Sequence, residues 1–141
     1  LMGEMHGKMS TYWDSGTLKR EDIYHDGKFI EGKCYNELGE EIEYFPYIKQ
    51  PELPGGLNKF LKENFRYPSK AKDKGITGTV YVTFYVNEKG KVQYVKILKG
   101  VNHLLDEEAI RVANLFPNWI PGEADGEKTN MRMILPVKFS L

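Results

Sequence analysis

The sequence predicts an α+β fold in which two helical elements pack on a three-stranded antiparallel sheet, preceded by an amino-terminal segment of β-hairpin repeats. Two stretches, residues 80–86 and 131–141, alternate apolar and polar side chains with the period of two that is typical of strands with one buried face. Two others, residues 57–65 and 104–116, carry apolar side chains at helical spacing. A two-stranded hairpin is marginal alone, so these pieces are expected to form one core.

The central hairpin begins with a strand that we expect to start near Ile76. Residues 87–90 (Asn-Glu-Lys-Gly) form its turn, because Gly90 can adopt the left-handed conformation that a four-residue hairpin loop requires. In the returning strand Val92 is out of phase with Val95 and Ile97, which predicts a β-bulge near Gln93.

Helices are expected on both sides of this hairpin. The stripe at residues 57–65 is interrupted by Tyr67-Pro68, and a second short helix follows over residues 69–74. A third helix over residues 104–116 has three acidic side chains at its start, residues 106–108, which we interpret as anions favoured by the helix dipole. The last strand, Met131 to Ser140, contains Pro136. Proline has no N–H, so this strand is expected at the edge of the sheet.

Residues 1–47 differ from the rest of the chain in sequence pattern, because they contain a degenerate repeat. Tyr-Trp-Asp-Ser-Gly at 12–16 returns in degenerate form as Tyr-Asn-Glu-Leu-Gly at 35–39, and aromatic and apolar residues lie between glycine-containing turns. We therefore predict a β-hairpin repeat segment over 1–47, a Pro/Gly joint over 48–56 and the main domain over 57–141.

Composition excludes several classes of function. With 40% hydrophobic and 28% charged residues the chain is typical of a globular protein, and no stretch approaches the ~18 apolar residues of a transmembrane helix. Cys34 is the lone cysteine and the three histidines are scattered, so we expect no metal site, no cofactor and no enzymatic activity. Basic residues concentrate at 57–100 without an aromatic platform, so nucleic acid is not an expected partner.

Six motifs over residues 51–141 resemble the TonB carboxy-terminal domain family, in the form common among Bacteroidetes. They are PELPGG (51–56), NFRYPSKAKDKGITGTV (64–80), NEKGKV (87–92), LDEEAIRV (105–112), PNWIPG (117–122) and LPVKFSL (135–141). The resemblance implies a periplasmic domain that is anchored to the inner membrane and coupled to its proton-channel complex. It also implies a partner, the TonB box of an outer-membrane receptor, captured by β-strand addition for nutrient uptake.

The amino-terminal segment resembles MORN-type repeats. The match rests on nine residues: Tyr12, Gly16, Leu18, Lys19, Glu21, Tyr24, Gly27, Lys28 and Gly32. This segment stands where the TonB resemblance would place a proline-rich spacer. Because so few repeats cannot bury a core alone, the segment is expected to pack against the next domain or to belong to a longer array.

The expected partner-binding residues lie on the last strand and after the first helix. They are Asn64, Phe65, Arg66, Tyr67, Met131, Arg132, Met133, Ile134, Lys138, Phe139 and Ser140. Two alternatives stay open. The edge could be closed by a homodimer partner or by the repeat segment, and the chain could be the sensor or ectodomain of a larger membrane protein such as a signalling metalloprotease.

Overall fold

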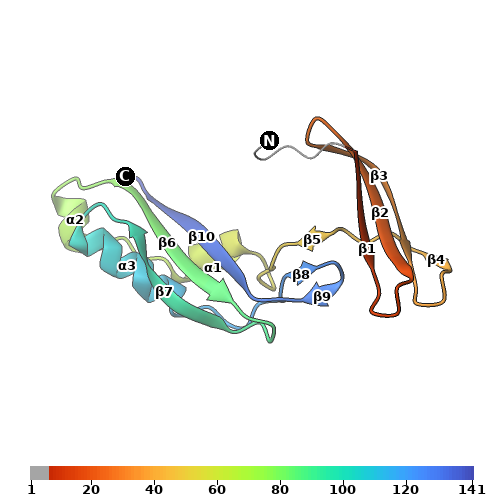
Figure 1. The fold of residues 1–141 in the computed structure, drawn as a ribbon. Coiled ribbons are helices and arrows are strands. Elements are labelled where there is room, and N and C mark those ends of the chain that lie inside the picture. The colour runs from red at the N-terminus through yellow and green to blue at the C-terminus, as the bar shows by residue number, and fades with distance from the viewer. Residues whose placement is uncertain (1–6) are drawn as a thin grey trace. The chain divides into compact units, whose positions relative to one another are not determined.

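The computed structural model describes residues 7–141 as two compact units, which divide between Pro46 and Tyr47. The first unit is an antiparallel sheet with the strand order β1-β2-β3-β4 (Figure 1). Its strands are β1 (Gly7–Tyr12), β2 (Leu18–His25), β3 (Lys28–Tyr35) and β4 (Glu41–Ile42). Each strand is joined to the next along the chain by a tight turn. Asp26 and Gly27, which connect β2 to β3, both have positive φ, as a two-residue hairpin turn requires.

The interior of the first unit is built around a buried ion pair. Arg20 and Asp22 are both completely buried, and the Arg20 Nη1 atom lies 2.9 Å from the Asp22 Oδ2 atom. The Arg20 guanidinium also donates to the carbonyl of Phe45 at 2.8 Å and lies over the rings of Tyr44 and Phe45. Burial, followed by the charge of Asp22, raises the pKa of the Tyr44 hydroxyl. This unit therefore relies on charge pairing and aromatic contacts where a larger domain would have an aliphatic core.

Two loops of this unit close in the same way, 23 residues apart. Trp13 N–H bonds to Thr17 O, as Asn36 N–H bonds to Glu40 O, and the glycine at the fourth position of each loop returns a bond to the first residue. Each loop thus spans five residues with a glycine of positive φ. The hairpin loop from Asn87 to Lys91 in the second unit closes with the same two bonds, so this geometry belongs to the loop type. The repeat and its assignment to the MORN type stay predictions.

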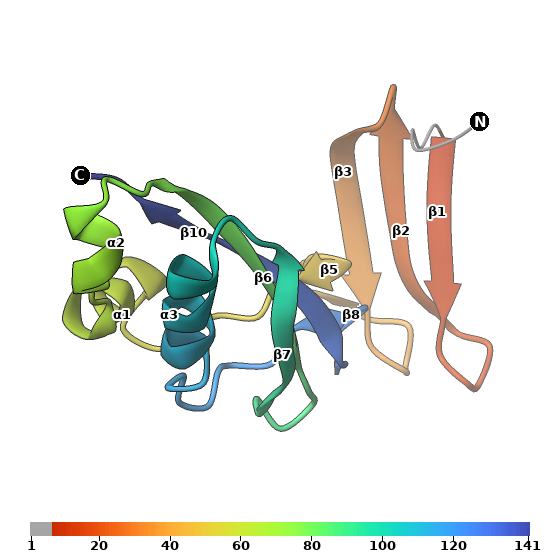
Figure 2. The same ribbon diagram turned by 90° about the vertical axis from the view of Figure 1, so that its left-hand side faces the viewer.

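The second unit is a mixed α/β domain with three helices. The helices are α1 (Leu57–Asn64), α2 (Ser69–Asp73) and α3 (His103–Ala113). The main sheet is antiparallel with the order β10-β6-β7, formed by β6 (Gly78–Val86), β7 (Val92–Lys99) and β10 (Met131–Phe139). The helices lie on one side of this sheet (Figure 2). No helix within residues 7–141 is long and apolar enough to cross a membrane.

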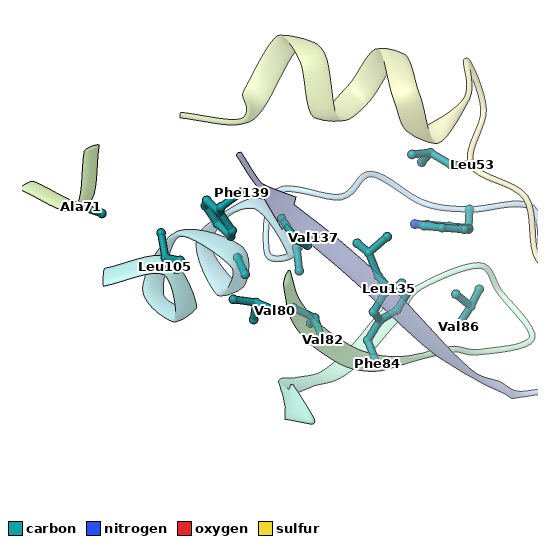
Figure 3. Packing of buried hydrophobic residues seen from close by; sticks show 13 residues of the cluster. Leu53, Ala71, Val80, Val82, Phe84, Val86, Leu105, Leu135, Val137 and Phe139 are labelled. Atoms are coloured by element: carbon teal, nitrogen blue, oxygen red, sulfur yellow. The ribbon is translucent and has the colours of Figure 1, made fainter. Parts of the chain in front are cut away.

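One apolar core holds the second unit together. β6 contributes Val80, Val82, Phe84 and Val86, β10 contributes Leu135, Val137 and Phe139, and α3 contributes Leu105, Ala109 and Ala113 (Figure 3). The alternating residues of both strands therefore point to the helix-covered face, as the period of two predicts.

The structure confirms the predicted bulge in β7 near Gln93. Tyr85 pairs with Gln93 and Thr83 pairs with Lys96, so Tyr94 and Val95 together face Phe84. The bulge is at Tyr94, the residue after Gln93, whose φ of 57° is positive. It brings Val92, Val95 and Ile97 onto the core as predicted.

The predicted joint over 48–56 is part of the second unit. β5 (Ile48–Lys49) pairs with β8 (Glu123–Ala124), which pairs in turn with β9 (Glu127–Lys128), and the sequence predicted a plain loop at β8 and β9. Glu52 forms a bridge with Ile120, and Leu53 is buried in the core. These residues are held by pairing and burial, so they do not act as a free linker.

Candidate partner-binding edge

β10 lies at one edge of the three-stranded sheet, because β6 is its single neighbour in the order β10-β6-β7. It pairs with β6 along its full length, from Met131 opposite Val86 to Phe139 opposite Gly78. In an antiparallel ladder, successive residues direct their N–H and C=O groups alternately to the neighbour and away from it. Pro136 has no N–H to give β6, so its position is expected to face outward. The same alternation then turns the backbone of Arg132, Ile134 and Lys138 outward.

The side chains of β10 alternate between the core and the open face of the sheet. Leu135, Val137 and Phe139 are buried, whereas Arg132, Ile134 and Lys138 are exposed. Arg132 crosses to β6, where its Nε atom donates to the Thr83 hydroxyl at 2.9 Å. That hydroxyl donates in turn to the carbonyl of Met133 at 3.0 Å. Of the predicted contact residues, Phe139 cannot offer its ring to a partner because only 1% of the residue is exposed. Ser140 lies just beyond the end of β10.

The structure brings residues 64–67 to the carboxyl end of β10, far from it in sequence. The rings of Phe65 and Tyr67 pack on Phe139, with centroid separations of 5.0 and 5.6 Å. The Tyr67 hydroxyl donates to the carbonyl of Ile76. Phe65 and Tyr67 therefore pack against β10. Contact of residues 64–67 with a partner stays a prediction.

α3 fixes the backbone of this segment through two charged side chains. Glu108 accepts a hydrogen bond from the Arg66 N–H at 2.7 Å and pairs with Arg111 at 2.7 Å. Arg111 also donates to the carbonyl of Asn64 at 2.7 Å. The hydrogen bonds that Arg111 donates to the Glu108 carboxylate raise the pKa of Arg111 above its usual range. The chain after α1 is thereby held at both a donor and an acceptor.

The interpretation of residues 106–108 as a set of dipole-stabilising anions is wrong for Glu108. Asp106 does accept from the Val101 N–H before the helix, at 3.0 Å, but Glu108 is only 8% exposed. Its position aligns with Leu105, Ala109 and Val112 on the buried face of α3. A carboxylate inside an apolar helical stripe indicates a buried polar contact, and this spacing was visible in the sequence.

Replacing Glu108 with alanine is expected to loosen residues 64–67. The change removes the hydrogen bond from the Arg66 N–H to a charged acceptor, and bonds to charged groups contribute about 1.5–3 kcal/mol. Glu107, which is exposed on the same helix, provides the control Glu107→Ala. Hydrogen exchange should show faster exchange at the amide of Arg66 in Glu108→Ala alone. An equal effect in both variants would contradict the assigned role.

Two apolar hollows flank the face of β10 that is turned toward the helices. The first, of about 310 Å³, lies between α1 and the second half of β10 and is lined by Asn58, Leu61, Lys62, Phe65, Val137 and Lys138. The second, of about 530 Å³, lies beside the first half of β10 and is lined by Pro51, Glu52, Leu53, Gly55, Gly56, Leu57, Trp119 and Met133. Val137 and Met133 belong to the same face of β10, and neither lining includes a residue of β6 or β7, so both hollows lie against the edge strand.

Among residues 7–141, no cluster of histidine, cysteine and acidic side chains is arranged to hold a metal ion. Cys34 is buried in the first unit and is a free thiol.

The second unit matches the model of a known protein family. The model of the Gram-negative bacterial TonB protein C-terminal matches residues 63–141, which is more than half of the chain. The chain belongs to the TonB C-terminal domain family. The match includes β10, α3 and all of residues 64–67, so the candidate edge lies inside the TonB C-terminal domain.

Curated relatives include the TonB proteins of two Helicobacter pylori strains, J99 and 26695. Both are 32% identical over 100 residues, which cover 62% of this chain and 33% and 32% of theirs. The chain thus spans about a third of the length of these relatives. The solution structure of the Helicobacter pylori TonB C-terminal domain is 30% identical, with a TM-score of 0.44, and the match covers 62% of this chain and 86% of that one.

Proposed function

We propose that the second unit is the partner-binding domain of a TonB-type energy transducer. It captures the TonB box, a short extended segment of an outer-membrane receptor, as an added strand on β10. The observation that carries the proposal is the position of β10 at the sheet edge in a TonB C-terminal domain. An unpaired edge offers backbone donors and acceptors to an extended peptide, and this is a recurring mode of peptide recognition.

The proposed contacts lie on both sides of Pro136. Arg132 and Ile134 present outward N–H groups before it and Lys138 presents one after it, while Pro136 interrupts the ladder. Met131, Met133 and Ser140 flank these positions, and Asn64 to Tyr67 lie beside the end of the strand. Each backbone hydrogen bond contributes about 0.5–1.5 kcal/mol net. A handful of them falls short of the ~8.2 kcal/mol of micromolar binding, so side chains must add to the affinity.

The wider setting is also part of the proposal. The domain works in the periplasm, and an amino-terminal segment anchors it to the inner membrane and to the proton-channel complex that supplies energy for nutrient uptake. The first unit is a MORN-type repeat segment of under two units that stands in place of a proline-rich spacer, in a Bacteroidetes-type transducer. The related sequences at 12–16 and 35–39 support the repeat, and the motifs over 51–141 support the type.

Replacing Ile134 with proline is expected to weaken capture of a receptor-derived TonB-box peptide without unfolding the domain. The substitution removes one outward N–H from the edge, at a position two residues from a proline that β10 already accommodates. Ile134→Thr is the matched control, because it shortens the same exposed side chain but keeps the N–H. The measurement is the peptide affinity of the full 141-residue chain by calorimetry, with circular dichroism to verify the fold.

The two variants separate the backbone from the side chain. Strand addition predicts that Ile134→Pro binds the peptide about two- to tenfold more weakly than Ile134→Thr does, which is the value of one backbone hydrogen bond. Unchanged binding by a folded Ile134→Pro protein would remove the strand-addition mechanism at this edge.

A further inference from the structure

We infer that the two hollows beside β10 select the partner segment by its spacing: two large apolar side chains four residues apart, with an acidic residue beside one of them. This inference rests on the proposed function, since it assumes that an extended segment pairs with β10. It adds the side-chain chemistry of that segment, which the edge itself does not specify.

The spacing follows from the register of β10. Met133 lines the hollow of about 530 Å³ and Val137 lines the hollow of about 310 Å³. Four residues of a strand span roughly 13 Å. An added strand has the same rise, so side chains on its helix-facing side reach both hollows only when they stand at positions i and i+4.

No third hollow lies between these two on the same face of β10, according to the burial of the residue midway between them. Leu135, which lies midway between Met133 and Val137 on the same face, is only 7% exposed and belongs to the packed core. The partner residue midway between the two apolar side chains therefore meets a closed surface. A small or polar residue suits that position, whereas a third large apolar residue gains no additional burial there.

The lining of each hollow indicates what enters it. The first hollow has Leu61, Phe65 and Val137 as apolar walls, and the second has Leu53, Trp119 and Met133. Both volumes lie in the range of roughly 300–1,000 Å³ that accommodates small ligands, so each holds one aliphatic or aromatic side chain with room to spare. Apolar side chains are therefore the expected occupants.

Charge distinguishes the two ends of the site. Lys62 and Lys138, both exposed, line the first hollow, whereas Glu52 lines the second. A carboxylate next to the apolar residue that enters the first hollow is attracted by both lysines, and next to the other it meets Glu52. The complementary segment is therefore extended and asymmetric in charge.

The test uses synthetic peptides of serine and threonine with one aspartate and two leucines. The leucines stand at positions i and i+4 in the first peptide, i and i+3 in the second and i and i+2 in the third, and a fourth peptide has one leucine. Each is titrated into the isotope-labelled full chain while the amides of residues 131–139 are followed by NMR. The peptide with a separation of four should bind about tenfold more tightly than the others, as expected when one more aliphatic side chain is buried.

Two variants assign the effect to the first hollow. Asn58→Trp places a large side chain in its lining from an exposed helix position, so the separation-of-four peptide should bind no better than the single-leucine peptide. Glu63→Trp puts the same bulk on α1 at an exposed residue outside both linings and should leave the tenfold preference intact. Equal effects of the two variants would overturn the assignment of this hollow.

The outcomes separate this inference from the proposed function. Shifts at residues 131–139 with equal affinity for all four peptides would overturn the spacing rule and leave strand addition standing. Shifts absent from β10 with every peptide and with a receptor-derived segment would overturn both. A concentration-dependent dimer that protects β10 and excludes the peptides would assign the edge to a second copy of the chain and would also overturn the inference.

Discussion

The first unit unfolds when Arg20 is replaced by methionine, if its interior depends on the buried ion pair. The substitution leaves Asp22, which is completely buried, without its cationic partner. Removing one member of a buried pair costs about 3–5 kcal/mol, which is comparable with the total stability of so small a unit. Hydrogen exchange read by mass spectrometry should then show loss of protection throughout β2 and β3, and unchanged protection in β6.

An exposed ion pair in the same sheet provides the control. The Lys8 Nζ atom lies 3.9 Å from the Glu21 Oε1 atom, and the two side chains are 65% and 38% exposed. Such pairs contribute about 0–1 kcal/mol, so Lys8→Met should leave the exchange pattern of β2 and β3 nearly unchanged. Full protection in Arg20→Met would show that aromatic packing of Tyr44 and Phe45 suffices without the charge pair.

Replacing Gly90 with alanine is expected to destabilise the second unit by about 3 kcal/mol. Gly90 has a φ of 83°, and an added Cβ would lie 1.9 Å from the carbonyl oxygen of Trp119. The left-handed conformation costs alanine about 1–2 kcal/mol, and the forced separation from a backbone atom adds about 1–3 kcal/mol. The clash also strains the bond from the Trp119 N–H to the Gly90 carbonyl, which is 2.8 Å long.

Gly75 isolates the conformational part of this effect. Its φ is 67°, and an added Cβ would meet nothing within 4 Å. Gly75→Ala should therefore cost only the ~1–2 kcal/mol of the left-handed conformation. The free energy of unfolding of the second unit is compared between the two variants by urea denaturation, with the hydrogen exchange of β6 amides as the probe. Equal losses would mean that the loop after α3 moves away from Gly90 without cost.

Local signals predicted the elements of the second unit well. The alternation at Val80 to Val86 and the stripe from Leu57 to Phe65 report burial on one face, and burial on one face is what a strand or helix in this core requires. Pro136 predicted the edge position of β10 because a missing N–H is a local property with a global consequence.

Long-range contacts were not predictable in the same way. The hydrogen bond between Glu108 and the Arg66 N–H joins residues 42 positions apart, and no periodicity encodes such a pair. β5 and β8 have two residues each, too few for an alternation to appear. Family resemblance and strand position predict which residues form the candidate site. The burial of Phe139 and the two hollows beside β10 arise from the folded arrangement and were not predictable from either.

Hydrogen exchange of the full chain, with and without a receptor-derived TonB-box peptide, tests strand addition most directly. The proposal predicts that the amides of Arg132, Ile134 and Lys138 become protected on binding, while the amides of β7 at the opposite edge do not change. Protection of β7 with no change at these three amides would contradict capture of the partner at β10.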